Sequence, residues 1–158
     1  MIRKQTIEDF LNDLASNKPT PGGGSVTAVT AATAAALVEM VANLTKEGKL
    51  KDLVGKAEEL RIKLLRLADE DAASFDAVMA AYRSKSKPEI KKALLGAIKV
   101  PEETKKLSQA VEKLAEIAVA RGNKNAVSDA STAIHLAQAA QKSAVENIRI
   151  NNEFLKKL

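Results

Sequence analysis

A glycine-rich stretch near the N-terminus is the first place where residue types suggest chemistry. It spans residues 19–25 and carries three consecutive glycines. Glycine lets the backbone approach a ligand closely, and a helix that starts at Ser25 offers unpaired amides at its positive end, which favours an anion. It is not a P-loop, because no lysine follows the glycines at the required place; a tight turn between two helices is the alternative. The residues expected to contact a ligand are Pro21, Gly22, Gly23, Gly24 and Ser25.

A single carboxylate, Asp71, interrupts an apolar helical stripe. The stripe runs through Leu64, Ala68, Phe75 and Val78 at helical spacing. A bare buried charge is costly, so the side chain must be paired, hydrogen-bonded or facing a ligand cavity. Desolvation would raise the pKa of Asp71 and make it a usable proton donor. The alternative is a carboxylate that caps a neighbouring helix or faces a partner subunit.

The last predicted helix carries a face with polar ends and a small, apolar centre. Asp129 lies at its start, and Asn147 and Asn151 lie near its end. Asp129 alone would simply favour the positive end of its helix, and Asn147 alone would suit a surface. The shared face with an apolar floor is more typical of a pocket wall. The centre of this face consists of Ala133, Leu136, Ala140 and Ala144.

A second polar pair, Glu39 and Asn43, lies one turn apart at the end of a small-residue face. The pair either serves a pocket or marks where an interface meets water. The only histidine, His135, has polar helical neighbours and is expected on the surface. We predict no metal site, because the chain has no cysteine, one histidine and no Glu-x-x-His pair of the di-iron type.

The elements that must position these residues are helices. Only seven glycines and four prolines occur among 158 residues, aromatics make up 3%, and no period-two apolar run suggests a strand. We therefore expect an all-α fold, a single domain over residues 1–158 built as a bundle of about six helices, two of them long. Pro101 is expected to end the fourth helix and open the fifth. The predicted helices are 6–16, 25–45, 52–83, 88–100, 101–121 and 126 or 128 to near the end, with a short break at 46–48.

Composition limits the classes of partner. The net charge is +5, but lysines alternate with glutamates along helical faces, which is typical of a solvated surface. Stacking aromatics are nearly absent, so we expect no nucleic-acid partner. The low-charge run 25–38 is too short to span a bilayer and no signal peptide is visible, so we expect a cytoplasmic protein without a membrane partner. The long helices carry more apolar face than one chain easily buries, which favours a homodimer.

Several separated motifs follow one another along the chain, at residues 20–26, 39–45, 69–72, 75–83, 122–123, 126–129 and 147–151. In this order they resemble one family, the cyclodeaminase domain of formiminotransferase-cyclodeaminase and its stand-alone bacterial relatives. Some of those relatives resemble methenyltetrahydrofolate cyclohydrolases. The lysine-rich connection 84–87 is shorter than in many relatives.

The resemblance implies an all-helical homodimer that binds folate in a cleft near the glycine-rich loop. It implies a cyclodeaminase that converts 5-formiminotetrahydrofolate to 5,10-methenyltetrahydrofolate, releases ammonia and requires no cofactor. Asp71 or Asp129 would be the acid/base group, with Glu39 as a third candidate. The alternatives are a methenyltetrahydrofolate cyclohydrolase and a non-catalytic folate-binding or assembly module. Residues that would meet the pterin or the glutamate tail, besides the glycine-rich loop, are Lys18, Asn43, Asn147, Arg149 and Asn151.

Overall fold

The computed structural model describes residues 1–46 and 50–158, and the regular structure within them is entirely helical. The prediction of an all-α fold is confirmed. Residues 47 and 48 of the predicted break lie outside the described residues. The elements are η1 (Ile2–Lys4), α1 (Ile7–Leu14), α2 (Gly23–Asn43), α3 (Lys51–Ser84), α4 (Lys87–Arg121), η3 (Lys124–Ala126) and α5 (Val127–Lys156).

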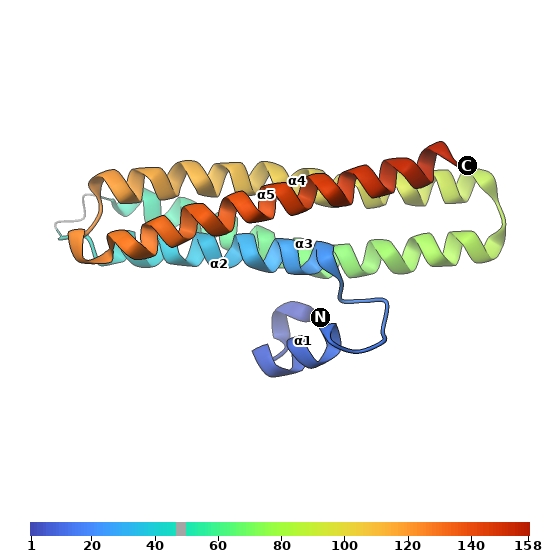
Figure 1. Cartoon of the computed structure of the whole chain (residues 1–158), viewed down its shortest axis with the longest axis horizontal. Coiled ribbons are helices and arrows are strands. Elements are labelled where there is room, and N and C mark those ends of the chain that lie inside the picture. The colour runs from blue at the N-terminus through green and yellow to red at the C-terminus, as the bar shows by residue number, and fades with distance from the viewer. Residues whose placement is uncertain (47–49) are drawn as a thin grey trace.

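Helices α2 to α5 form an elongated bundle, and α2 is the short member (Figure 1). It has 21 residues, whereas α3, α4 and α5 have 34, 35 and 30. In Figure 1, α2 begins near the middle of the bundle, while the later part of α3 continues beside α4 and α5. The fourth helix of the bundle therefore begins only at Gly23, and among the residues that the structure describes no fourth bundle helix lies beside the later part of α3. The glycine-rich loop lies where α2 begins.

Alanine faces pack the helices together in the half of the bundle that contains α2. Buried alanines recur along α2 and along α5, where they follow spacings of three and four residues. Small side chains let helix backbones approach closely, so α2 packs against both α3 and α5. The apolar face predicted for the last helix is confirmed at Ala133, Ala140 and Ala144. The buried alanines of α5 are Ala130, Ala133, Ala137, Ala140 and Ala144.

Pro101 does not divide the chain into two helices, and that prediction is wrong. Helix α4 runs without a break from Lys87 to Arg121 with Pro101 buried inside it. Proline has no N–H, so the carbonyl of Ala97 loses its usual helical donor. The side-chain amide of Asn151 on α5 donates to the Ala97 oxygen at 3.1 Å instead. A neighbouring helix thus supplies the missing hydrogen bond, which sequence periodicity does not reveal.

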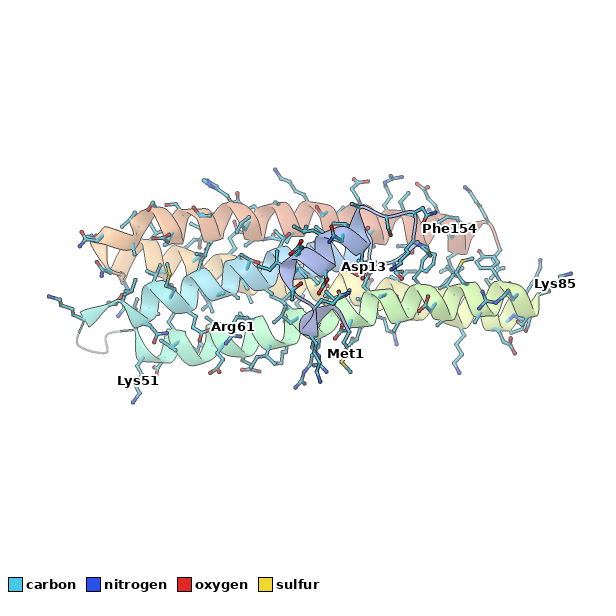
Figure 2. All side chains as sticks on the ribbon, turned by 90° about the horizontal axis from the view of Figure 1, so that it is seen from below. Met1, Asp13, Lys51, Arg61, Lys85 and Phe154 are labelled. Atoms are coloured by element: carbon cyan, nitrogen blue, oxygen red, sulfur yellow. The ribbon has the colours of Figure 1, made fainter. Side chains whose placement is uncertain are left out.

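Helix α1 lies beside the bundle rather than in it (Figure 1). The Thr6 hydroxyl accepts from the backbone N–H of Asp9 at 3.0 Å and so caps the helix. The outer apolar residues Ile7 and Leu11 are 80% and 53% exposed. Figure 2 shows this N-terminal segment, with Asp13, crossing the middle of the bundle.

The low charge of α2 reflects its place in the core. By length and composition Gly23–Asn43 would be able to cross a membrane, but 56% of its apolar window is buried inside the fold. A core helix surrounded by other helices needs no polar face, so the same residue pattern results.

Candidate active site

A cavity of about 370 Å³ lies where α2 begins. Its volume falls in the range of small-molecule sites. The glycine-rich loop forms one side, α3 and α5 form the walls, and Ala97 of α4 contributes to the lining. The lining residues are Pro19, Thr20, Gly22, Gly23, Gly24, Asp71, Ser74, Phe75, Val78, Met79, Tyr82, Ala97, Asn147, Ile150, Asn151 and Phe154.

Asp71 packs directly against the first turn of α2. A Cβ atom added to Gly24 would overlap Asp71 Oδ1, so only glycine allows this approach. Gly22 is the N-cap of α2 and supplies no side-chain cap. The Ser25 hydroxyl, fully buried, donates to Asp71 Oδ2 at 2.9 Å and is also 3.2 Å from the Ala68 carbonyl oxygen. Asp71 therefore lies beside the N-terminus of α2, held by the Ser25 hydroxyl, and it lines the cavity as well.

The environment of Asp71 shifts its pKa upward. Burial raises the pKa of Asp71 above its usual value, and hydrogen bonds from the Ser25 hydroxyl and backbone N–H oppose that shift. The positive end of α2 also favours negative charge at this place. A carboxyl whose pKa is raised in a cavity is suited to donate a proton to a ligand.

Two asparagines of α5 complete the polar lining. Asn147 and Asn151 lie one turn apart and both reach the cavity. An added Cβ at Gly23 would lie 3.9 Å from Asn147 Oδ1, which places this amide beside the glycine-rich loop. The Asn151 amide bridges α5 to the Ala97 carbonyl of α4. The predicted pocket wall at the end of the last helix therefore lies opposite Asp71, across the glycine-rich loop.

The apolar walls include residues that sequence reasoning did not assign to a site. Helical spacing predicts a core stripe through Phe75 and Val78, yet the structure places both around the cavity together with Tyr82. Met79, Ile150 and Phe154 also line it and are partly solvent-exposed. The signal was present in the helical spacing, since Tyr82 follows Asp71, Phe75 and Val78 along one face. The flat rings of Phe75, Tyr82 and Phe154 provide apolar surface for a planar ligand.

Other predicted site residues lie away from this cavity. Glu39 forms an ion pair with Arg61 at 2.8 Å, and with Asn43 it lines a separate shallow depression. Glu39 is sixteen residues along α2 from Gly23, which corresponds to roughly 24 Å of helix. Asp129 precedes Asn147 by eighteen residues on α5, or roughly 27 Å. In Figure 2, Arg61 and Phe154 accordingly lie in opposite halves of the bundle.

The remaining predicted contacts flank the cavity. Pro21 belongs to the lining loop, although its neighbours and not its own side chain form the wall. Arg149 is exposed and pairs with Glu146 at 2.9 Å and with Glu153.

His135 is exposed, as expected. No group of three or more His, Cys, Asp or Glu side chains suited to a metal ion occurs in the described part of the chain.

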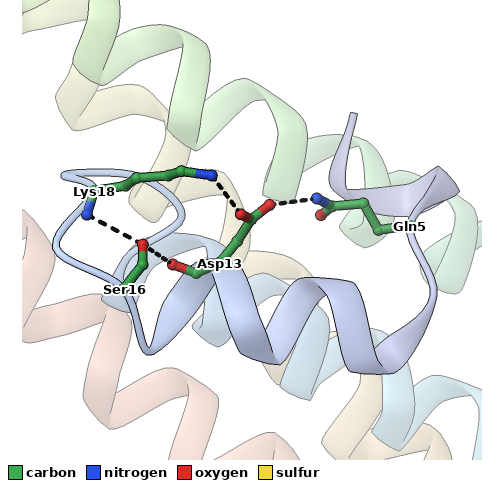
Figure 3. Close-up of polar contacts among 4 residues, drawn as sticks. All are labelled: Gln5, Asp13, Ser16 and Lys18. Carbon is green, nitrogen blue, oxygen red and sulfur yellow. Dashed lines mark hydrogen bonds and ion pairs between the residues drawn. The ribbon is translucent and has the colours of Figure 1, made fainter.

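Lys18, the predicted contact for a folate tail, is held by the N-terminal segment (Figure 3). Its ammonium group pairs with Asp13 Oδ1 at 2.6 Å, and Gln5 donates to Asp13 Oδ2 at 2.7 Å. The Lys18 and Gln5 hydrogen bonds hold the pKa of Asp13 below its usual value. The Ser16 hydroxyl accepts from the Lys18 backbone N–H at 3.1 Å. These contacts fix the chain just before the glycine-rich loop.

Comparisons with known proteins agree over nearly the whole chain. The profile of the formiminotransferase-cyclodeaminase family matches residues 6–157. A methenyltetrahydrofolate cyclohydrolase from Methylorubrum extorquens is 39% identical, over 96% of this chain and 81% of that protein. A formiminotetrahydrofolate cyclodeaminase structure from Thermotoga maritima matches with a TM-score of 0.93 and 35% identity, over 98% of this chain and 82% of that one. The formimidoyltransferase-cyclodeaminase of Rattus norvegicus is 26% identical, over 92% of this chain but 30% of that protein.

The fold and the cavity define an all-α protein with one carboxyl group poised at a helix N-terminus beside an apolar pocket. Together with the profile match over residues 6–157, they place the chain in the formiminotransferase-cyclodeaminase family. The predicted resemblance to this family is confirmed.

Replacing Gly24 by alanine tests the close approach of Asp71. The added methyl group would overlap the carboxylate, so Gly24→Ala should lower the free energy of unfolding by about 1–3 kcal/mol. The matched control is Gly55→Ala in α3, where an added Cβ meets nothing within 4 Å. That change should leave stability equal or raise it by about 0.4–1 kcal/mol. Urea denaturation measures both, and equal stabilities for the two variants would contradict the crowding at Gly24.

Replacing Asp71 by asparagine tests the raised pKa. Because the folded-state pKa of Asp71 lies above the unfolded value near 3.8, the unfolded chain ionises first and parental stability falls as pH rises between the two values. The asparagine side chain does not titrate, so the variant's stability relative to the parent should increase through that window and then level off. Asp13→Asn is the control, because the pKa of Asp13 is lowered and its effect on stability should change with pH in the opposite direction. That effect should be small, since solvent screens the exposed side chain. A pH-independent difference for Asp71→Asn would refute the shift.

Proposed function

We propose that this chain is a formiminotetrahydrofolate cyclodeaminase. It converts 5-formiminotetrahydrofolate to 5,10-methenyltetrahydrofolate and releases ammonia. Support comes from the similarity to the Thermotoga maritima cyclodeaminase over 98% of this chain. The observation that carries the proposal is Asp71, a carboxyl group with a raised pKa in a cavity whose other polar lining side chains are amides and hydroxyls.

The reaction needs one positioned acid and close contact between two nitrogens. N10 of the folate attacks the formimino carbon on N5, and a new carbon–N10 bond forms. The bond from that carbon to the amino nitrogen then breaks, and the nitrogen leaves as ammonia. The double bond from the carbon to the formimino nitrogen opens during the attack, and that nitrogen takes up the proton that N10 loses. Asp71 supplies the second proton, so the nitrogen leaves as ammonia while the N5 lone pair completes the methenyl bridge. The reaction changes no oxidation state, so we propose that it requires no redox cofactor.

The cavity walls suit the ring end of such a substrate. Phe75, Tyr82 and Phe154 offer flat surfaces to the pterin, and Asn147 and Asn151 offer amide groups to its polar edge. Holding the ring rigidly would keep N10 in a near-attack geometry over the one-carbon unit. A cavity of about 370 Å³ is small for a whole folate, so the glutamate tail would extend outward.

A second candidate is methenyltetrahydrofolate cyclohydrolase, favoured by the 39% identity to the Methylorubrum extorquens enzyme. Here water attacks the bridge carbon of the 5,10-methenyl folate, and Asp71 in its ionised form accepts a proton from that water. The bond from the carbon to N5 then breaks, N5 takes up a proton, and a formyl group remains on N10. Both activities need one acid/base group and one clamp for the ring, so the same cavity serves either.

We also propose that the chain is a homodimer. The exposed apolar residues of α1, Ile7 and Leu11, and those near the end of α2, Met40 and Leu44, would be covered by a second copy. Burial of such patches is a common driving force for association. Sedimentation would distinguish the dimer from a monomer.

The deciding experiment is a time course with purified protein. With 5-formiminotetrahydrofolate, the cyclodeaminase should produce methenyltetrahydrofolate and ammonia in equal amounts above the uncatalysed rate. With 5,10-methenyltetrahydrofolate, a cyclohydrolase should instead accelerate loss of the methenyl absorbance. Acceleration of neither reaction, with folate still bound, would refute both enzymes and leave a folate-binding module.

Asp71→Asn tests the acid directly. Removing the proton donor should lower kcat by roughly 10²–10⁴-fold while the affinity for the folate changes little, because the side chain keeps its size and the oxygen that accepts from the Ser25 hydroxyl. The control is Asp129→Asn, which lies at the other end of α5 and should turn over like the parent. The reverse pattern, with loss only in Asp129→Asn, would move the acid to Asp129.

A further inference from the structure

Helix α4 contains an internal proline whose effect reaches the cavity. Pro101 is buried and has no N–H, so it leaves the carbonyl oxygen of Ala97, one turn earlier, without its helical donor. Ala97 is itself a lining residue of the cavity. An unpaired buried carbonyl is unfavourable, and the hydrogen bond from Asn151 Nδ2 to this oxygen, at 3.1 Å, removes the deficit.

This hydrogen bond fixes which way round the Asn151 amide lies. A carbonyl oxygen can only accept, so the end of the amide that faces Ala97 must be the NH₂ end. The amide group is planar, and its Oδ1 therefore points away from Ala97. Within residues 1–46 and 50–158, no donor is hydrogen-bonded to Oδ1. The bond to Ala97 uses one of the two N–H groups of Nδ2, and Oδ1 is accordingly the acceptor that the amide offers to a ligand in the cavity.

The neighbouring asparagine illustrates the contrast. Asn152 Nδ2 donates at 2.9 Å to Ile148 O, four residues earlier on its own helix. Asn152 does not line the cavity. Asn151 instead donates one N–H of its NH₂ group to a different helix, at the Ala97 carbonyl that lacks a helical donor because of Pro101.

We propose that Pro101 is a positioning residue that sets Asn151 as a hydrogen-bond acceptor, so that the site selects a ligand edge carrying an N–H group. The proposal rests on the proposed function for the identity of the ligand. In a pterin, the matching edge is the amino group at C2 with the adjacent ring N–H. Pro101 touches no ligand and acts only through the Ala97 carbonyl.

The first test needs no ligand. Pro101→Ala restores a backbone N–H to Ala97 O, so this variant should fold at least as stably as the parent. Asn151→Ala should destabilise the parent clearly but destabilise the Pro101→Ala protein much less, because Ala97 O then keeps a donor. The matched control is Pro88→Ala, in the first turn of α4, where no helical carbonyl loses a donor. Additive effects of Pro101→Ala and Asn151→Ala would overturn the coupling.

The second test measures what Asn151 recognises. With 5-formiminotetrahydrofolate, Pro101→Ala should raise KM about three- to tenfold with little change in kcat, and Pro88→Ala should change neither. Calorimetry with 5,10-methenyltetrahydrofolate and its 2-desamino-2-methyl analogue should show that the parent rejects the analogue. Pro101→Ala and Asn151→Ala should each reduce that discrimination by about tenfold.

The outcomes separate the two proposals. Equal discrimination in the parent, Pro101→Ala and Asn151→Ala would overturn the role of Asn151 as an acceptor while leaving the folate activity standing. A parent protein that neither binds nor converts either folate would overturn the proposed function and the ligand named here. The stability coupling between Pro101 and Asn151 would then be judged by the first test alone.

Discussion

The contact between the Asp71 carboxylate and the first turn of α2 is the constraint on which the site depends. It requires glycine at position 24, because any side chain there would occupy the place of the carboxylate. It requires Ser25 inside the bundle, where its hydroxyl holds Asp71 Oδ2. The N-cap of α2, Gly22, has no side chain that could cap the helix, and the Asp71 carboxylate from α3 lies beside this positive helix end. One side chain thus serves structure and chemistry together.

The length of α2 determines where a ligand can enter. Three long helices continue past its first residue, so their side chains surround a space that the fourth helix does not fill. Close packing of the alanine faces keeps α2 and α5 in fixed register beside this space. Because Asp71, Asn147 and Asn151 all project from rigid helices rather than from loops, the polar groups are preorganised around the cavity.

The hydrogen bond between Asn151 and Ala97 couples α5 to α4. A proline that would normally break a helix is accommodated because its neighbour supplies a donor. The same contact orients a polar group in the cavity, so the irregularity in α4 and the polarity of the site have one origin.

The sequence by itself determined the all-α fold, the glycine-rich stretch that lines the cavity, and the family. It also singled out Asp71, since a carboxylate within an apolar stripe needs an explanation at the level of one helix. Helical periodicity identifies a face but not what the face meets. The continuity of α4 through Pro101 therefore depended on a donor from α5, and the distance of Glu39 and Asp129 from the cavity depended on where α2 begins in the bundle. Helical spacing places Phe75 and Tyr82 on the same face as core residues. Only the tertiary structure decides that no bundle helix covers them before α2 begins, so that both line a cavity.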